Sequence, residues 1–251
     1  MFCVVIATYN EAANIEFLLK EVEAQFSPAD FRIIVVDDDS PDGTASLANQ
    51  ANDTYGNIIV HTRKSQRGLG TALVAGIQLA LEYQNCEHIV TMDGDLSHDP
   101  REMGQLLSAA ATADLVQGSR YVADGSVVGW PLRRLLLSHT ANILCRRLLG
   151  TGLRENTTNF RVYSRRLAQM ILDCPVPLGY EFMLMPILLA RQAQLPIVEV
   201  GITFRDRRAG KSKMGLRTLA RWGGFLIQAA WRQTVLRRKL VKIGQTPATE
   251  N

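Results

Sequence analysis

The segment His88-Ile-Val-Thr-Met-Asp-Gly-Asp95 is the clearest fold signal in this 251-residue chain. It is a short apolar run that favours a buried strand, and an acidic turn ends it. On both sides, similar runs alternate with segments of helical periodicity. This alternation predicts an α/β fold with a doubly wound, largely parallel sheet. The expected strands are Cys3–Ala7, Arg32–Val36, Ile58–His61, His88–Met92 and Leu115–Gly118, and the expected helices are Asn14–Gln25, Thr44–Asn52, Gly70–Tyr83 and Arg101–Ala111.

The pattern changes after about residue 121, where helical periodicity dominates. It predicts helices over Leu132–Leu149 and Arg165–Leu172 and a last strand over Ile197–Phe204. Leu216–Leu240 combines an apolar face with basic residues, as a helix at a membrane interface does. We therefore expect one domain over residues 1–215, a basic amphipathic helix over 216–242 and a disordered tail over 243–251.

Composition excludes several classes of protein. A hydrophobic fraction of 47% with 21% charged residues is typical of a folded globular protein. No apolar run approaches the ~20 residues that a membrane-spanning helix needs, and no secretory signal is expected. The cysteines are far apart in sequence, which favours reduced thiols without a metal or a redox role: they are Cys3, Cys86, Cys145 and Cys174.

The net charge is +4, and the basic residues are unevenly distributed. Between Arg205 and Lys242 there are twelve basic residues and a single acid, Asp206. This excess points to phosphates or to an anionic membrane surface as the partner. Nucleic acid is not expected, because no zinc finger, helix-turn-helix or aromatic RNA-binding signature accompanies the basic segment.

Two acidic clusters follow predicted strands. Asp93 and Asp95 lie on a tight turn, and Asp37 and Asp38 end a neighbouring strand. A lone D-x-D is usually an ordinary turn, but ligands of parallel sheets bind at the carboxyl ends of the strands, where both clusters would meet. Converging carboxylates suit Mg²⁺ or Mn²⁺, which also binds substrate phosphates. The first strand ends without the glycines of a dinucleotide-binding turn, so a dehydrogenase is not expected.

Eight motifs together resemble the polyprenyl-phosphate (dolichol-phosphate) mannose synthases, which are inverting glycosyltransferases of the GT-A fold. The resemblance covers most of the chain, and its last three motifs are the most specific. The motifs are VVIATYNEAANI (4–15), VVDDDSPDGT (35–44), RGLGTA (67–72), MDGDLSHDP (92–100), GSRY (118–121), GWPLRRLLLS (129–138), TTNFRVY (157–163) and FRDRRAGKSK (204–213).

The resemblance implies a role for each residue that matches a family motif. Nucleotide binding falls to Ala7, Tyr9, Glu11, Asp37, Asp38, Asp93 and Gly94. Metal binding falls to Asp93, Asp95 and Ser97, the acceptor phosphate to Arg120, Arg133 and Ser138, and the donor phosphates to a mobile segment with Arg207, Ser212 and Lys213. The catalytic residues would be Asp95, Arg120 and Arg207. The chain departs from the family at Ala7, Asp39, Asn159 and Met185, where Pro, Asn or Gly, Gly, and Glu respectively are common.

The implied reaction transfers mannose from GDP-mannose to a polyprenyl (dolichyl) monophosphate, with Mg²⁺ or Mn²⁺ as cofactor. A phosphate monoester has a second pKa near ~6, so the acceptor oxygen is anionic at neutral pH and needs no general base. The implied location is peripheral, on the cytoplasmic face of a membrane, and the need for membrane subunits stays open. Two alternatives remain: transfer from UDP-glucose or another donor, and a non-catalytic nucleotide-sugar-binding subunit.

Some polar and aromatic residues have simpler interpretations. The resemblance also places Arg134 with the residues for the acceptor phosphate. Arg134 and Arg208 are equally well explained as surface arginines that are solvated or paired with an acid. We expect Asp42 to form a turn or a helix cap and His98 to lie in a surface loop. The tryptophans are expected to be packing or interface residues rather than platforms for a sugar: they are Trp130, Trp222 and Trp231.

Overall fold

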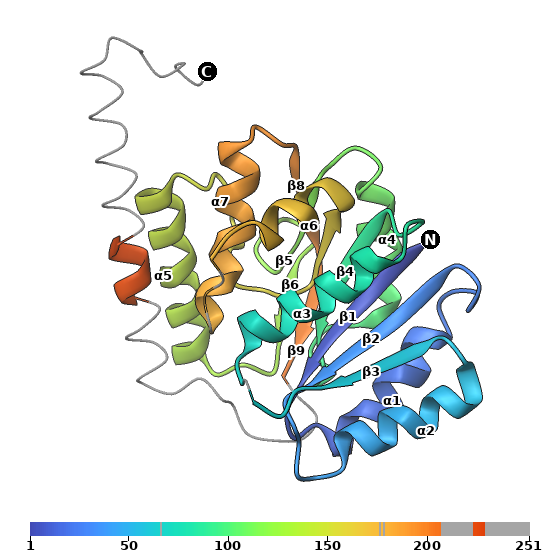
Figure 1. The fold of residues 1–251 in the computed structure, drawn as a ribbon. Helices are drawn as coiled ribbons and strands as arrows, with labels where there is room; N and C mark the ends of the chain where they lie inside the picture. The colour runs from blue at the N-terminus through green and yellow to red at the C-terminus, as the bar shows by residue number, and fades with distance from the viewer. Residues whose placement is uncertain (66, 176, 178, 207–222, 229–251) are drawn as a thin grey trace.

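The computed structural model describes residues 1–65, 67–175, 177, 179–206 and 223–228. In this part of the chain one sheet runs through the centre of the molecule (Figure 1). Its seven strands have the spatial order β3 (Ile58–Thr62), β2 (Phe31–Asp37), β1 (Phe2–Thr8), β4 (His88–Asp93), β7 (Arg161–Ser164), β5 (Leu115–Ser119) and β8 (Ile197–Gly201). Strand β7 is antiparallel to both of its neighbours, and the other pairings are parallel.

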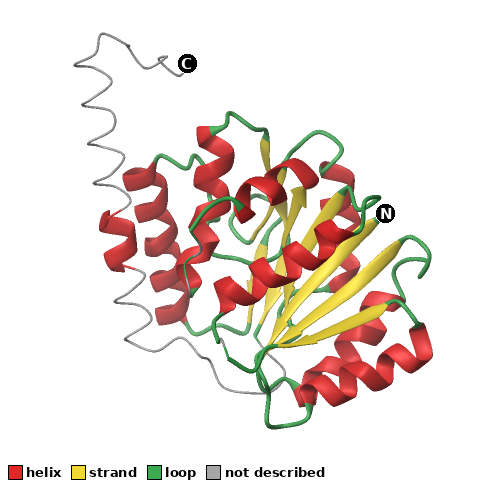
Figure 2. Ribbon diagram, in the orientation of Figure 1, coloured by secondary structure: helices red, strands yellow, loops and turns green. Residues whose placement is uncertain are grey.

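Helices cover both faces of the sheet, which explains why the central strands are apolar throughout rather than alternating (Figure 2). One face packs against α1 (Ala12–Glu23), α2 (Thr44–Tyr55) and α4 (Met103–Ala109). The other packs against α3 (Leu69–Glu82), α6 (Arg165–Leu172) and α7 (Met185–Gln192). In β1, Val4 and Ile6 join the first core while Cys3 and Val5 join the second, as the period of two in a strand requires. The predicted doubly wound α/β fold is confirmed.

Two further elements lie beside this sandwich. A second sheet pairs β6 (Ser126–Val128) with β9 (Thr203–Arg205) in parallel. Helix α5 (Leu132–Leu149) and helix α6 have the bounds that the sequence predicted. Helix α5 lies at the edge of the molecule, next to the short helix at 223–228 (Figure 1).

Several predicted elements need correction. The helix expected over Arg101–Ala111 begins with a 3-10 turn, Pro100–Glu102, because Pro100 lacks an amide hydrogen and Asp99 caps the turn. The last strand, expected over Ile197–Phe204, is split into β8 and β9. Strand β7 and helix α7 were not predicted from the sequence.

The C-terminal region is described in part only. The predicted interface helix and the tail lie outside the described residues, except for 223–228. There Leu226 is 3% exposed and packs with Cys145 and Leu149 of α5 and with Leu184. Within the described residues, no helix combines the length and the apolar character that a membrane crossing requires.

Candidate active site

The carboxyl ends of β1, β2 and β4 bring the two acidic clusters to one edge of the sheet. The strand register places Ala7 beside Asp93, and Thr8 beside Asp37. These residues are thus neighbours across adjacent strands although 29 to 86 positions separate them in sequence. The convergence that the sequence predicted is therefore present in the structure.

Asp37 is fully buried, and its carboxylate shapes the turn after β2. One oxygen accepts a hydrogen bond from the Thr8 hydroxyl at 2.8 Å and another from the Ser40 hydroxyl at 2.6 Å. Its second oxygen accepts from the Ser40 amide at 2.8 Å. The carboxylate thus fixes the path of the chain in the turn after β2.

Asp38 forms an ion pair with Arg63, a residue that the sequence analysis did not select. The Arg63 Nε donates to Asp38 at 2.8 Å, the Nη2 of the same guanidinium contacts the same oxygen, and the Gly68 amide donates to the other oxygen at 2.8 Å. Both groups of the pair are less than a tenth exposed. Beside them, Arg67 lies 4.9 Å from the centroid of the Tyr9 ring and donates to its hydroxyl at 3.2 Å. Asp38, which follows β2, thus joins the end of β3 at Arg63 to the start of α3 at Gly68.

Glu11 and Asp42 build the start of α1. The Glu11 carbonyl accepts from the Asn14 and Ile15 amides, and its own amide donates to the Thr44 hydroxyl at 2.9 Å. Asp42 accepts from the amides of Ala12 and Thr44, so the prediction that it forms a turn or cap is confirmed. Burial raises the pKa of Asp42, but its hydrogen bonds from Thr44 and Ala12 outweigh burial and lower it.

The D-x-D turn follows β4 directly. Asp95 is 7% exposed, and one of its oxygens accepts from the Ser97 amide at 3.1 Å and from the Ser97 hydroxyl at 2.6 Å. Ser97, predicted as a metal ligand, thus contacts the Asp95 carboxylate. A Cβ atom on Gly94 would lie 3.2 Å from the Thr8 side chain, so glycine lets the turn approach β1 closely.

His98 was expected in a surface loop, and this expectation is wrong. Its side chain is fully buried and stacks on Phe160, with 5.1 Å between the ring centroids. Its Nδ1 accepts from the Asp93 amide at 3.1 Å, and its Nε2 lies 3.0 Å from the Thr158 hydroxyl. Burial lowers the pKa of His98 despite the nearby Asp93 and Asp95. The ring is enclosed between the end of β4 at Asp93 and the residues before β7, Thr158 and Phe160. Because these segments are far apart in sequence, the burial of His98 is not visible in the local sequence.

The donor atoms around Asp93 suit a hard divalent cation. Among the described residues, no group of three or more His, Cys, Asp or Glu side chains is placed to hold a metal ion. The site offers instead the carboxylates of Asp93 and Asp95. Beside them is Asn159, whose buried Oδ1 has no hydrogen-bond partner among the described atoms and whose Nδ2 donates to Asp93 at 3.1 Å. An all-oxygen set of this size fits Mg²⁺ or Mn²⁺, which retains waters and takes phosphate oxygens as further ligands.

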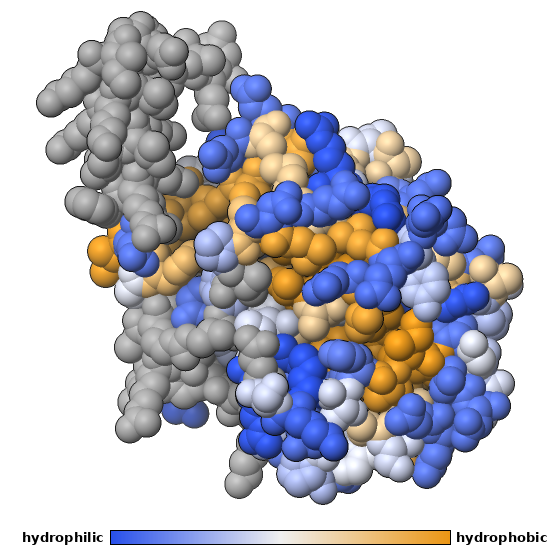
Figure 3. Space-filling view, viewed as in Figure 1, coloured by the Kyte–Doolittle hydropathy of each residue, from blue (hydrophilic) through white to orange (hydrophobic). Residues whose placement is uncertain are grey.

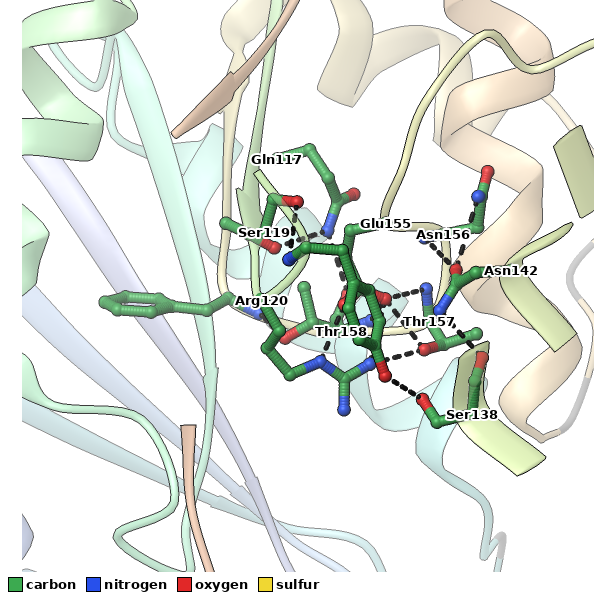
Figure 4. Close-up of polar contacts among 12 residues, drawn as sticks. Gln117, Ser119, Arg120, Ser138, Asn142, Glu155, Asn156, Thr157 and Thr158 are labelled. Atoms are coloured by element: carbon green, nitrogen blue, oxygen red, sulfur yellow. Dashed lines mark hydrogen bonds and ion pairs between the residues drawn. The ribbon is translucent and has the colours of Figure 1, made fainter. Parts of the chain in front are cut away.

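A buried ion pair joins Arg120, directly after β5, to Glu155 (Figure 4). The Nε of Arg120 donates to Glu155 at 2.6 Å and its Nη2 donates to the second oxygen at 2.9 Å. Thr157 adds hydrogen bonds to both partners. Burial raises the pKa of Glu155, but the charge and hydrogen bonds of Arg120 outweigh burial and lower it. Arg120, predicted to bind the acceptor phosphate, is therefore already paired with a carboxylate that the sequence analysis missed.

The first turns of α5 carry the remaining predicted acceptor residues. Ser138 accepts a hydrogen bond from the Tyr121 hydroxyl at 2.8 Å, whereas Arg133 is exposed. Arg134 lies 3.9 Å from the centroid of the Trp130 ring and pairs with Asp206 at 2.8 Å. Arg134 is thus paired with an acid in the structure, and its predicted role at the acceptor phosphate stays a prediction.

Other predicted residues lie outside the described part of the chain. These are Arg207, Ser212 and Lys213 of the expected mobile segment, together with Arg208, Trp222 and Trp231. Their predicted roles are not tested by the structure. Trp130 is described, and it packs edge-on against Phe204 with 5.2 Å between the ring centroids, as expected for a packing residue.

Comparison with known proteins gives a consistent result. Residues 3–172 match the family model Glycosyl transferase family 2. The polyprenol monophosphomannose synthase of Mycolicibacterium smegmatis is 40% identical over 230 residues, which cover 88% of this chain and 86% of that protein. The undecaprenyl-phosphate mannosyltransferase of Micrococcus luteus is 35% identical over 235 residues, which cover 90% of this chain and 94% of that protein.

Solved structures share the fold at lower identity. A glucosyl-3-phosphoglycerate synthase from Mycobacterium tuberculosis, in complex with Mn²⁺, UDP and glucosyl-3-phosphoglycerate, has a TM-score of 0.63 and is 18% identical; the match covers 99% of this chain and 81% of that one. A mannosyl-3-phosphoglycerate synthase from Rubrobacter xylanophilus has a TM-score of 0.64 and is 20% identical, with 99% and 77% covered. At these identities the likeness concerns the fold.

Proposed function

Because the chain belongs to glycosyl transferase family 2, we propose that it transfers mannose from GDP-mannose to a polyprenyl monophosphate. The observation that carries this proposal is that the acidic ends of β2 and β4 meet at one edge of the sheet. A cluster of arginines and aromatic rings, here called the arginine wall, lies after β5: Arg120, Tyr121, Trp130 and Arg134. The names of the two relatives, both mannosyltransferases for polyprenyl phosphates, support the choice of sugar and acceptor.

In the proposed reaction, an oxygen of the acceptor phosphate attacks C1 of the mannose from the side opposite the diphosphate. The new C1–O bond forms as the bond between C1 and the β-phosphate oxygen breaks, and GDP leaves with its electron pair. No proton is transferred, because the acceptor oxygen is already anionic. A reaction without a general base agrees with the contacts of His98. Its side chain is buried, and both of its ring nitrogens are already engaged, one by the Asp93 amide and one by the Thr158 hydroxyl.

Asp93 and Asp95 would hold the divalent cation, which neutralises charge on the leaving diphosphate. Their oxygens and the buried Asn159 amide favour such an ion. The solved synthase that shares the fold was crystallised with Mn²⁺ and UDP, which supports the same type of cofactor here. We propose that Tyr9 and the Asp37–Asp38 turn contact the nucleoside, and that Arg207, Ser212 and Lys213 contact the donor phosphates.

Arg134 is the described cation best placed for the acceptor phosphate. Its side chain is about one-third exposed, and Asp206, its partner, is 41% exposed, so a phosphate is able to compete for it. Arg120 lies deeper, where its guanidinium is 5.1 Å from the Trp130 ring centroid and paired with Glu155. We propose that Arg120 adds positive charge near the acceptor, while Arg134 and the exposed Arg133 bind the acceptor phosphate directly.

The surface of α5 suits the lipid part of the acceptor. Five of its leucines are more than 40% exposed, and exposed arginines lie among them: Leu132, Leu136, Leu137, Leu144 and Leu148 with Arg133, Arg146 and Arg147. Apolar surface is visible at this edge of the molecule in Figure 3. Leucine with arginine favours the boundary of an anionic bilayer. We propose that α5, with the predicted helix at 216–242, holds the enzyme on the cytoplasmic face of a membrane.

A transfer assay tests the proposal. The purified protein is incubated with Mg²⁺ and vesicles carrying a polyprenyl phosphate, with labelled GDP-mannose and labelled UDP-glucose in parallel, and the lipid is extracted. We expect label in the lipid phase from GDP-mannose only. Label from UDP-glucose alone would show that the donor is UDP-glucose and not GDP-mannose. Binding of nucleotide without transfer from either donor would favour a non-catalytic subunit.

A further inference from the structure

Asn159, two residues before β7, lies next to Asp93 at the end of β4. The antiparallel β4–β7 ladder ends at the pair Thr91–Arg161, and continuing its register by two residues brings Asn159 opposite Asp93. Cross-strand neighbours of this kind share a face of the sheet, with their Cβ atoms about 5 Å apart. The Asn159 Nδ2 accordingly donates to the Asp93 Oδ1 at 3.1 Å, and Thr91 fixes the Asn159 carbonyl through a 2.7 Å hydrogen bond from its hydroxyl.

His98 contacts Asp93 through the main chain, and its Nε2 lies 3.9 Å from the Asp93 Oδ2. The Asp93 amide is a donor only, so the Nδ1 that it contacts must be the unprotonated ring nitrogen. The proton is therefore on Nε2, which donates to the hydroxyl of Thr158. Thr158 directly precedes Asn159. The His98 ring also stacks on Phe160. Three consecutive residues thus contact this pair of side chains: Thr158 and Phe160 contact His98, and Asn159 contacts Asp93.

We propose that His98 and Asn159 are positioning residues that together fix Asp93 for divalent-cation binding. His98 holds the main chain at the start of the D-x-D turn, and Asn159 orients the carboxylate. Asn159 is 3% exposed, and the Nδ2 contact places its amide beside the Asp93 carboxylate. Its Oδ1 has no hydrogen-bond partner among the described atoms and is an oxygen of the kind that suits the cation or one of its waters.

This inference rests on the proposed metal dependence of donor binding. Partners that orient a metal ligand typically change metal affinity 10–100-fold when removed. The measurable quantity is the gain in nucleotide affinity that Mn²⁺ provides. It is the ratio of the dissociation constants of GDP, and of UDP in parallel, measured by calorimetry in EDTA and in Mn²⁺.

We expect Asn159→Ala to reduce this gain about tenfold while the affinity in EDTA and the melting temperature in EDTA stay near their wild-type values. Asn49→Ala is the matched control, because Asn49 is exposed on α2 and donates only to the Ala45 carbonyl in the described contacts. His98→Leu should reduce the gain as well. His98→Asn should restore part of it, since an amide oxygen is able to accept from the Asp93 amide.

The outcomes separate the inference from the proposed function. If the wild-type protein binds neither nucleotide more tightly with Mn²⁺, the proposed metal dependence is wrong and the inference fails with it. If the wild type shows the gain and Asn159→Ala keeps it unchanged, the metal site stands and the positioning role is refuted. Equal losses in EDTA and in Mn²⁺ leave the gain intact, so they also contradict the inference.

Discussion

Replacing Glu155 by Gln should destabilise the protein strongly. The Glu155 side chain is fully buried and that of Arg120 is 5% exposed, and two hydrogen bonds of 2.6 and 2.9 Å join them. The substitution keeps the shape of the side chain but leaves the arginine charge without a counter-charge. Removal of one partner from a buried ion pair costs about 3–5 kcal/mol. Since domains are stable by only ~5–15 kcal/mol, this is a large fraction of the total.

Urea unfolding followed by circular dichroism measures this loss. We expect the midpoint to fall while the slope of the transition is unchanged. Arg101→Gln is a matched control, because Arg101 also pairs with a carboxylate through two hydrogen bonds but is 67% exposed; we expect its midpoint to stay near wild type. The double variant Arg120→Met/Glu155→Gln should recover part of the loss. A loss below about 1 kcal/mol in Glu155→Gln would refute the reasoning.

Three further outcomes are expected. Asp95→Ala should abolish transfer without changing the circular dichroism spectrum; near-normal turnover with Mg²⁺ would contradict its role. Burial raises the pKa of Glu23, so the stability it contributes is complete below its ordinary pKa and is lost as pH rises through the raised value. The melting temperature of Glu23→Gln should therefore rise relative to that of the wild type as pH increases from 4 to 7. A difference in melting temperature that does not change with pH would contradict this. Leu136→Glu should weaken vesicle co-sedimentation by about tenfold or more, since burial of a leucine contributes roughly 1.5–3 kcal/mol and about 1.4 kcal/mol is tenfold, whereas the exposed Gln50→Glu should not.

The parallel part of the fold was predictable because each strand is a continuous apolar run that ends in a polar turn. The same pattern correctly placed Asp37 and Asp93 at one edge of the sheet. Strand β7 was missed because it is a four-residue antiparallel insertion, and its partners lie far away in sequence. Without β7, the opposition of Asn159 to Asp93 is invisible.

The charged residues show the same limit. Arg120 was identified by its motif, but Glu155, 35 positions later, was not, because the carboxylate that compensates a buried arginine follows from tertiary structure alone. Arg63 was missed for the same reason, since its partner Asp38 comes from the adjacent strand. His98 looked exposed because it is surrounded by turn-forming residues, and the packing of Phe160 and Phe204, both distant in sequence, encloses it.

The most direct test of the central claim is the structure of the lipid product. After incubation with GDP-mannose, Mg²⁺ and vesicles carrying a polyprenyl phosphate, the extracted lipid is examined by nuclear magnetic resonance. The account predicts a mannosyl phosphodiester whose C1 configuration is the inverse of that in GDP-mannose. A lipid product that retains the donor configuration, or no mannosyl lipid at all, would contradict it.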